Sequence, residues 1–145
     1  MSARIFLDTN ILLYQFGEDG DKRAKAIDIL DQAVKTDNYV ISYQVIQEFS
    51  NVALNEKRKY FSVQELKSYL QDILIPLCKF YPSSDFYLEG LRIKNKYKYC
   101  FYDSLILAAA IRLGCSHIYS EDLHSDQKFE GLQIQNPFKT GSKKK

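Results

Sequence analysis

Short apolar runs alternate along the chain with longer segments whose apolar residues recur every three or four positions. The short runs predict β-strands, and the longer segments predict amphipathic helices. Strands are predicted at residues 5–7, 39–41 and 117–119, with further candidates at residues 77–81 and 132–134. This alternation predicts an α/β fold with a mainly parallel central sheet and helices on both of its faces.

Polar side chains that can accept hydrogen bonds from free N–H groups mark the starts of the predicted helices. One helix begins at Ile11, directly after the first strand. The other predicted starts are Asp21, for a helix to residue 34; Ser42, for a helix to residue 53; the capping box of Ser62 and Glu65, for a helix to Leu74 before Pro76; and Ser83 or Ser84, for a helix through Ile93.

The segment from residue 102 to residue 113 has no polar face. It is apolar all round except at Asp103, Ser104 and Arg112, and Gly114 follows as a stop. A helix that is apolar on every side is typical of a buried position. We therefore predict that this helix lies at the centre of the fold.

The 145 residues suffice for one domain with a single core. We predict that this domain spans residues 1–138, without an internal repeat or a linker. Residues 139–145 are basic and lack a core pattern, so we expect a disordered tail.

Basic residues outnumber acidic ones only slightly. Lys and Arg number 20 against 18 Asp and Glu, and the net charge of +2 is too weak by itself to indicate a nucleic-acid partner. Two groups of basic residues could track the phosphates of a nucleic acid. They are Lys57, Arg58 and Lys59, and Arg92, Lys96 and Lys98. The ordinary interpretation of such charge runs is a solvated surface.

The three cysteines are scattered and odd in number, which is typical of buried thiols in a reducing compartment. With only two histidines, a zinc site of the usual Cys/His spacing has no support. An acidic residue at position 8 argues against a signal peptide, and the apolar run at 105–111 is too short to cross a membrane. We therefore expect a cytoplasmic protein.

Four carboxylates occur where the local pattern does not require one. Asp8 ends the first strand, Glu48 flanks the apolar face of its helix, Asp103 lies in the first turn of the most apolar helix, and Asp122 follows the strand at 117–119. The ends of parallel strands share one edge of a sheet, where ligands bind. Clustered carboxylates repel one another unless protons or cations neutralise them. Without Cys or His alongside, the preferred cations are Mg²⁺ or Mn²⁺.

Each carboxylate also has an ordinary structural explanation. Asp8, or its neighbour Thr9 or Asn10, could simply cap a helix. Asp103 could serve only as a favourable partner of the helix dipole. Glu48 could be a surface residue and Asp122 a turn residue. The occurrence of all four together favours a functional site.

Four segments resemble, in order, the acidic motifs of PIN-domain ribonucleases. They are residues 6–12, 47–49, 101–110 and 119–123. The similarity extends from Ile5 to Phe138 and is greatest to the VapC-like toxins of type II toxin-antitoxin pairs. It implies a PIN-like three-layer fold and Mg²⁺- or Mn²⁺-dependent endonucleolytic cleavage of RNA.

The resemblance also assigns roles to residues. It makes Asp8, Glu48, Asp103 and Asp122 the metal ligands and catalytic carboxylates. Asn10 could orient the first carboxylate, and Ser120 stands where the family often has a hydroxyl residue. Glu121 could assist or point to solvent. Whether one or two metal ions are bound stays open.

The same resemblance implies an antitoxin whose peptide occupies the acidic groove, and a homodimer, without a membrane partner. A housekeeping RNA-processing nuclease and a non-catalytic module that binds RNA or protein are the alternatives. A phosphomonoesterase with Asp8 as nucleophile is disfavoured, because such enzymes need a second acid where Asn10 stands.

Overall fold

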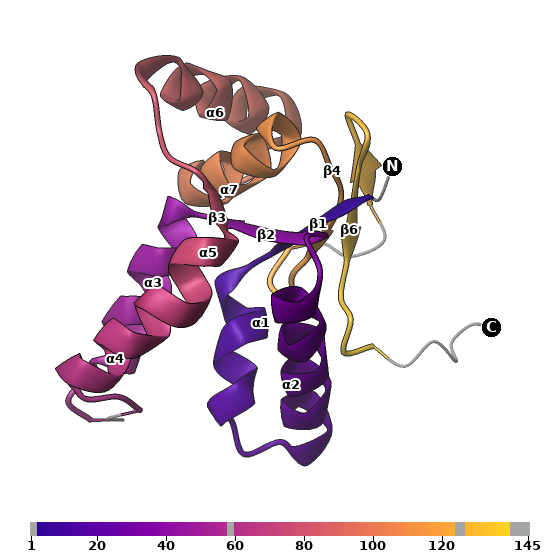
Figure 1. Cartoon of the computed structure of the whole chain (residues 1–145). Coiled ribbons are helices and arrows are strands. Elements are labelled where there is room, and N and C mark those ends of the chain that lie inside the picture. Colours follow the sequence, from indigo (N-terminus) through magenta and orange to yellow (C-terminus); the bar gives the residue numbers. More distant parts are fainter. Residues whose placement is uncertain (1–2, 58–59, 124–126, 140–145) are drawn as a thin grey trace.

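The computed structural model describes residues 3–57, 60–123 and 127–139. A six-stranded sheet crosses the middle of this part of the chain, in the order β3-β2-β1-β4-β6-β5 (Figure 1). The strands are β1 (Arg4–Leu7), β2 (Tyr39–Ser42), β3 (Cys78–Phe80), β4 (Cys115–Tyr119), β5 (Lys128–Phe129) and β6 (Leu132–Gln135). Neighbouring strands are parallel except for β5, which is antiparallel to β6. The predicted mainly parallel sheet is confirmed.

Helices cover both faces of the sheet, as predicted from the alternating pattern (Figure 1). They are α1 (Thr9–Leu13), α2 (Gly20–Lys35), α3 (Tyr43–Ala53), α4 (Val63–Tyr69), α5 (Ile75–Leu77), α6 (Ser84–Tyr97) and α7 (Phe101–Arg112). A 3-10 turn, Tyr14–Phe16, follows α1. In Figure 1, α1 and α2 lie on one side of the strands and α6 and α7 on the other.

Helix α7 is buried as predicted, and it packs against β2 and β4. Its residues from Ser104 to Ala110 are all buried. Helix α6 approaches it closely at Gly90, where an added Cβ would stand 2.5 Å from the Leu105 side chain. The absence of a side chain at Gly90 therefore lets the two helices pack in contact. This packing fixes the first turn of α7, which holds Asp103.

Helix boundaries differ from the prediction in several places. Helix α1 begins at Thr9 rather than at Ile11, and Asp8 is its N-cap. Asp19 caps α2 rather than Asp21, by accepting hydrogen bonds from two N–H groups of the first turn. The capping box of Ser62 and Glu65 is present as predicted. However, the helix continues past Pro76 through a π-helical segment, Leu70–Leu74, into α5. The wide π turn relieves the clash between a proline ring and the carbonyl four residues earlier, so the chain does not have to end its helix there.

The remaining differences concern short or local features. Sequence reasoning missed β5, because two residues are too few for a pattern; Gly131, at φ +85°, makes the tight turn to β6. Cys78 and Cys115 are buried thiols as predicted, but Cys100 is exposed at the start of α7. In the described ranges, no helix is long and apolar enough to cross a membrane. The predicted tail lies outside the described residues except for Lys139.

Candidate active site

The site forms where the strand order changes direction. From β1 the chain proceeds to β2 and β3 on one side, whereas β4 and β6 lie on the other side. Loops that leave two neighbouring parallel strands toward opposite sides leave a crevice between them, and ligands bind in such crevices. The Asp8 N–H donates to the carbonyl of Tyr119 at 3.0 Å, so the ends of β1 and β4 are held together. The residues that follow both strands therefore meet.

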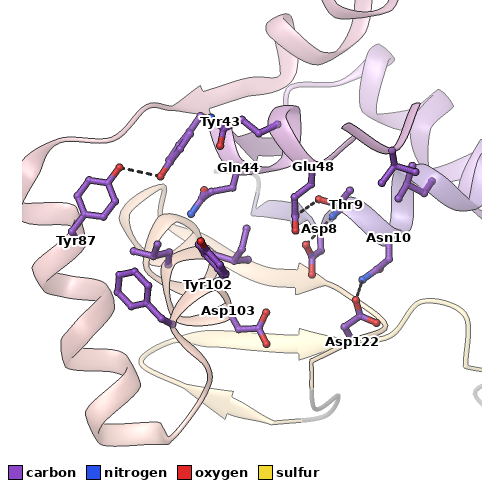
Figure 2. Close-up of a pocket in the computed structure, with 16 residues that line it drawn as sticks. Asp8, Thr9, Asn10, Tyr43, Gln44, Glu48, Tyr87, Tyr102, Asp103 and Asp122 are labelled. Carbon is purple, nitrogen blue, oxygen red and sulfur yellow. Dashed lines mark hydrogen bonds between the residues drawn. The ribbon is translucent and has the colours of Figure 1, made fainter. Parts of the chain in front are cut away.

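A pocket of about 690 Å³ opens at this edge, and all four predicted carboxylates line it (Figure 2). Asp8 follows β1, Glu48 comes from α3, Asp103 from the first turn of α7 and Asp122 from the loop after β4. Since these elements are far apart in the sequence, the fold itself brings the carboxylates together. Among the described residues that line this pocket, none is a lysine or an arginine.

Asp8 is the most buried of these carboxylates, with 9% of its surface exposed. One carboxylate oxygen accepts the N–H of Thr9 at 2.8 Å, and the other accepts the Ser120 hydroxyl at 2.8 Å. Burial raises the pKa of Asp8 to about 6, the nearby charges of Glu48 and Asp122 add to this, and the two hydrogen bonds oppose it. No lysine or arginine among the described residues of the pocket lining compensates the charge of its ionised form.

Ser120 is fully buried and connects Asp8 to the loop after β4. While its hydroxyl donates to Asp8, its oxygen accepts the N–H groups of Asp122 at 3.2 Å and Leu123 at 3.4 Å. One side chain thus holds the first carboxylate and the backbone of the fourth. A hydroxyl at this position can donate to Asp8 and accept both backbone N–H groups at once.

Asn10 orients the fourth carboxylate. We expected it to orient Asp8, but its amide donates to Asp122 at 3.1 Å and approaches Ser120 at 3.5 Å. Its carbonyl oxygen accepts the N–H of Glu121 at 3.1 Å. Asn10 and Ser120 therefore fix the loop after β4 from two directions, and Ser120 orients Asp8.

Glu48 and Asp103 complete the pocket from the two helices that face each other across it (Figure 2). Glu48 is exposed, and it lines the pocket. The Thr9 hydroxyl donates to its carboxylate at 2.6 Å. Sequence reasoning missed this role of Thr9, because nothing in a strand-to-helix junction indicates a partner on another helix. Asp103 is half-buried.

Glu121 lies next to the site but is engaged elsewhere. One carboxylate oxygen accepts the Tyr14 hydroxyl, and the other accepts the Lys22 ammonium group at 2.6 Å. Burial works against its charged form, but these hydrogen bonds outweigh it and lower the pKa of Glu121. Lys22 also lies 4.8 Å from the centre of the Tyr14 ring. Glu121 therefore fastens the loop after β4 to α2.

The predicted RNA-contacting residues that the structure describes, Lys57, Arg92, Lys96 and Lys98, do not line the pocket. Arg92 is bound by Glu89 at 2.8 Å and by Glu130 at 2.7 Å, so two carboxylates compensate its charge. Lys96 lies 5.4 Å from the centre of the Tyr97 ring, and Lys98 ends α6 in the left-handed conformation. Lys57 is exposed. The predicted Arg58 and Lys59 lie outside the described residues.

The donor set of the pocket fits a hydrated, oxygen-preferring cation. Its acidic donors are carboxylates, which suit Mg²⁺ and Mn²⁺ better than softer metals. However, no group of three or more Asp, Glu, His or Cys side chains in the described ranges is close enough to hold an ion directly. Because Mg²⁺ keeps several of its waters and takes only one or two carboxylates, water can bridge the remaining distances.

The burial of Asp8 gives the free energy of unfolding a pH dependence. Its folded-state pKa of about 6 lies above the ordinary value of 3.8. Between these values the folded chain binds more protons than the unfolded chain, so stability decreases as the pH rises. The full difference corresponds to about 3 kcal/mol without divalent cations. We expect the stability of Asp8→Asn relative to wild type to increase by about that amount from pH 4 to pH 7, measured by urea unfolding in EDTA.

A matched control is Asp37→Asn, in the exposed turn before β2 at the opposite edge of the sheet. Its pH profile should follow that of the wild type. If the stability of wild type and of Asp8→Asn changed with pH in parallel, burial would not raise the pKa of Asp8.

Comparison with known protein families matches residues 5–128 to the PIN domain. No curated protein matches the chain in sequence. Among solved structures, a chain of a "Toxin-antitoxin complex from Klebsiella pneumoniae" has a similar fold, with a TM-score of 0.62 and 20% identity over 93% of this chain and 98% of that chain. The family match extends from the first strand beyond the fourth carboxylate, as the resemblance of the four motifs predicted. The chain belongs to the PIN domain family.

Proposed function

We propose that the protein is a metal-dependent endoribonuclease that hydrolyses phosphodiester bonds of RNA. The observation that carries this proposal is the convergence of Asp8, Glu48, Asp103 and Asp122, from four separate elements, on one pocket without a compensating lysine or arginine in its described lining. Membership of the PIN domain family supports it, because PIN domains are typically nucleases that use divalent metals.

In this proposal the four carboxylates hold Mg²⁺ or Mn²⁺, directly or through water. When bound, the ion polarises the phosphoryl oxygen and lowers the pKa of a water molecule. Asp8 is kept in place by Ser120 and the Thr9 N–H, and Asp122 by Asn10. Glu48 is exposed to the pocket, so its carboxylate can accept the proton of the attacking water.

We further propose that the protein is the toxin of a toxin-antitoxin pair and works in the cytoplasm. The solved structure with the similar fold is described as such a complex, which supports an antitoxin as partner and leaves a homodimer as an expectation. Expression of the wild-type chain without its partner should arrest growth, whereas expression of Asp8→Asn should not. Unimpaired growth with the wild type would favour a housekeeping nuclease.

A non-catalytic binding module is the second candidate. It is favoured by the spacing of the carboxylates, since no three acidic, His or Cys side chains of the described chain form a compact metal site. Such a module would retain RNA or a protein partner without turnover. Mg²⁺-dependent product formation therefore separates the two candidates.

The proposal is tested by incubating a mixed, structured RNA pool with the purified chain in EDTA, in Mg²⁺ and in Mn²⁺. Cleavage should occur with either metal and stop in EDTA. Cleavage that continues in EDTA would contradict the metal requirement. Retention of intact RNA by a folded protein under all three conditions would favour the binding module.

A further inference from the structure

The pocket has an aromatic wall beside its carboxylates. Tyr102 lies next to Asp103 in the first turn of α7 and is 79% exposed, although most of the rest of this helix is buried. Both residues line the pocket, and Figure 2 shows the Tyr102 ring drawn between Gln44 and Asp103. A large exposed aromatic side chain at the entrance of a pocket loses little conformational entropy when it becomes ordered, and it offers a face for stacking.

Gln44 contributes a polar group to the same wall. Its carbonyl oxygen accepts the hydroxyl of Ser42, whereas its Nε2 is buried and has no hydrogen-bond partner. A buried donor without a partner is unfavourable, and such groups in folded proteins call for an explanation. An occupant that brings an acceptor to this wall would satisfy the amide once the side chains that cover Nε2 move aside.

Tyr43 and Tyr87, which also line the pocket, hold this wall in place. The hydroxyl groups of Tyr43 and Tyr87 are 3.3 Å apart, and this contact joins α3 to α6 across the pocket (Figure 2). The Tyr43 ring packs edge-on against Phe86, which is fully buried. Tyr102, Gln44 and the Tyr43–Tyr87 pair therefore form an aromatic wall with one free amide donor.

We propose that Tyr102 and Gln44 form a subsite for one unpaired nucleobase next to the scissile phosphate. This inference rests on the proposed function and assigns to its site two residues that bind a base. A nucleobase is uncharged and stacks on aromatic rings, and its edge presents acceptors that an amide N–H can reach. A phosphate would instead need cations, and the described lining of the pocket has none of its own.

The different needs of the base and the phosphate divide the pocket into two parts. The phosphate would bind on the side of the carboxylates, which would hold the ion, and the base would stack against Tyr102. In a duplex the bases are stacked inside the helix, and unstacking them costs free energy. The subsite therefore favours loops and single strands over paired RNA.

The test is binding of fluorescein-labelled octauridylate and octaadenylate, followed by anisotropy in Ca²⁺, an ion that replaces Mg²⁺ without supporting its chemistry. Tyr102→Ala should weaken binding by about 5- to 100-fold, because one stacking interaction is lost. Tyr102→Phe should bind within about twofold of wild type, because the stacking face remains. Gln44→Leu should weaken binding by about 2- to 10-fold through loss of one donor. An eight-base-pair RNA duplex should bind more weakly than either single strand.

The matched control is Tyr81→Ala. Tyr81 is also an exposed tyrosine, 60% accessible, but it follows β3 and is not part of the aromatic wall as defined above. Its replacement should leave binding unchanged. Equal binding by Tyr102→Ala and wild type would overturn the proposal, as would equal losses in Tyr102→Ala and Tyr102→Phe. Duplex binding as tight as single-strand binding would overturn it too.

Cleavage measurements separate this subsite from the proposed function. Tyr102→Ala should lower kcat/KM for a single-stranded oligonucleotide, while the Mg²⁺ concentration for half-maximal rate stays that of wild type. Tyr102-dependent binding of RNA that is never cleaved would refute the nuclease and support the subsite. Cleavage with the same kcat/KM in both proteins would support the nuclease and overturn the subsite. If Tyr102→Ala weakens binding of a protein partner and leaves RNA binding intact, the wall is a protein-binding surface and the subsite is refuted.

Discussion

Replacing Asp8 with asparagine is expected to lower metal-dependent RNA cleavage by at least about 100-fold while the protein stays folded. Loss of residues that only support metal ligands typically costs 10- to 100-fold, so loss of the most buried of the proposed ligands should cost more. The asparagine amide keeps the shape of the aspartate side chain, and its oxygen can accept the Thr9 N–H that Asp8 accepts. The measurement is the initial rate of cleavage at saturating Mg²⁺, with circular dichroism to verify the fold.

Asp37→Asn serves again as the control, because it removes one carboxylate from the opposite edge of the sheet. It should cleave at the wild-type rate. Full activity in Asp8→Asn would contradict the role of this carboxylate, whatever the other three residues do.

The second large effect is expected for Ser120→Ala. This change removes the donor to Asp8 and the acceptor of the Asp122 and Leu123 N–H groups, and Ser120 itself is fully buried. We expect a 10- to 100-fold loss of cleavage at limiting Mg²⁺, typical of residues that orient metal ligands. We also expect about 1–3 kcal/mol of lost stability, because buried N–H groups lose their partner.

The dependence of the cleavage rate on Mg²⁺ concentration distinguishes a residue that orients a metal ligand from one that is itself a proposed ligand. Raising the Mg²⁺ concentration should restore much of the activity of Ser120→Ala but not that of Asp8→Asn. Ser116→Ala is the matched control, since Ser116 lies on β4, the strand that Ser120 directly follows, and its hydroxyl donates to the Arg4 carbonyl at 3.3 Å. A Mg²⁺ requirement equal to wild type in Ser120→Ala would show that the hydroxyl only stabilises the fold.

The sheet and the meeting of its polar ends could be predicted because both follow from local patterns. Apolar runs such as residues 5–7 and 117–119 are short enough to indicate strands. Once parallel pairing is assumed, Asp8 and Asp122 must emerge at the same edge. The apolar composition around residue 106 likewise predicted that α7 is buried. In each case one segment contained the whole signal.

Features that depend on partners far away in the sequence could not be predicted. The direction of the Glu121 side chain depends on Tyr14 and Lys22, which belong to other elements. The bond from Thr9 to Glu48 spans 39 positions. The helix continues past Pro76 because of a π turn, and no residue type in the sequence predicts such a turn. In all three cases tertiary packing selected among conformations that the local sequence allows equally.

The groups of basic residues were the least informative signal. Arg92 belongs to a basic group that could have tracked phosphates, yet Glu89 and Glu130 bind it. The sequence shows Glu89 three positions away, but the contact with Glu130 depends on the β5–β6 turn. Sequence reasoning also missed Tyr102, which lines the pocket, because attention in that motif went to its neighbour Asp103.

The central claim is that these carboxylates form a binding site for a divalent metal ion. It is tested most directly by titrating the metal-free protein with Mn²⁺ and following the free ion by electron paramagnetic resonance. Wild type and Asp37→Asn should bind Mn²⁺ saturably and equally, and Asp8→Asn should bind at least about tenfold more weakly. Binding of equal strength in Asp8→Asn, or no binding by the folded wild type, would contradict the account.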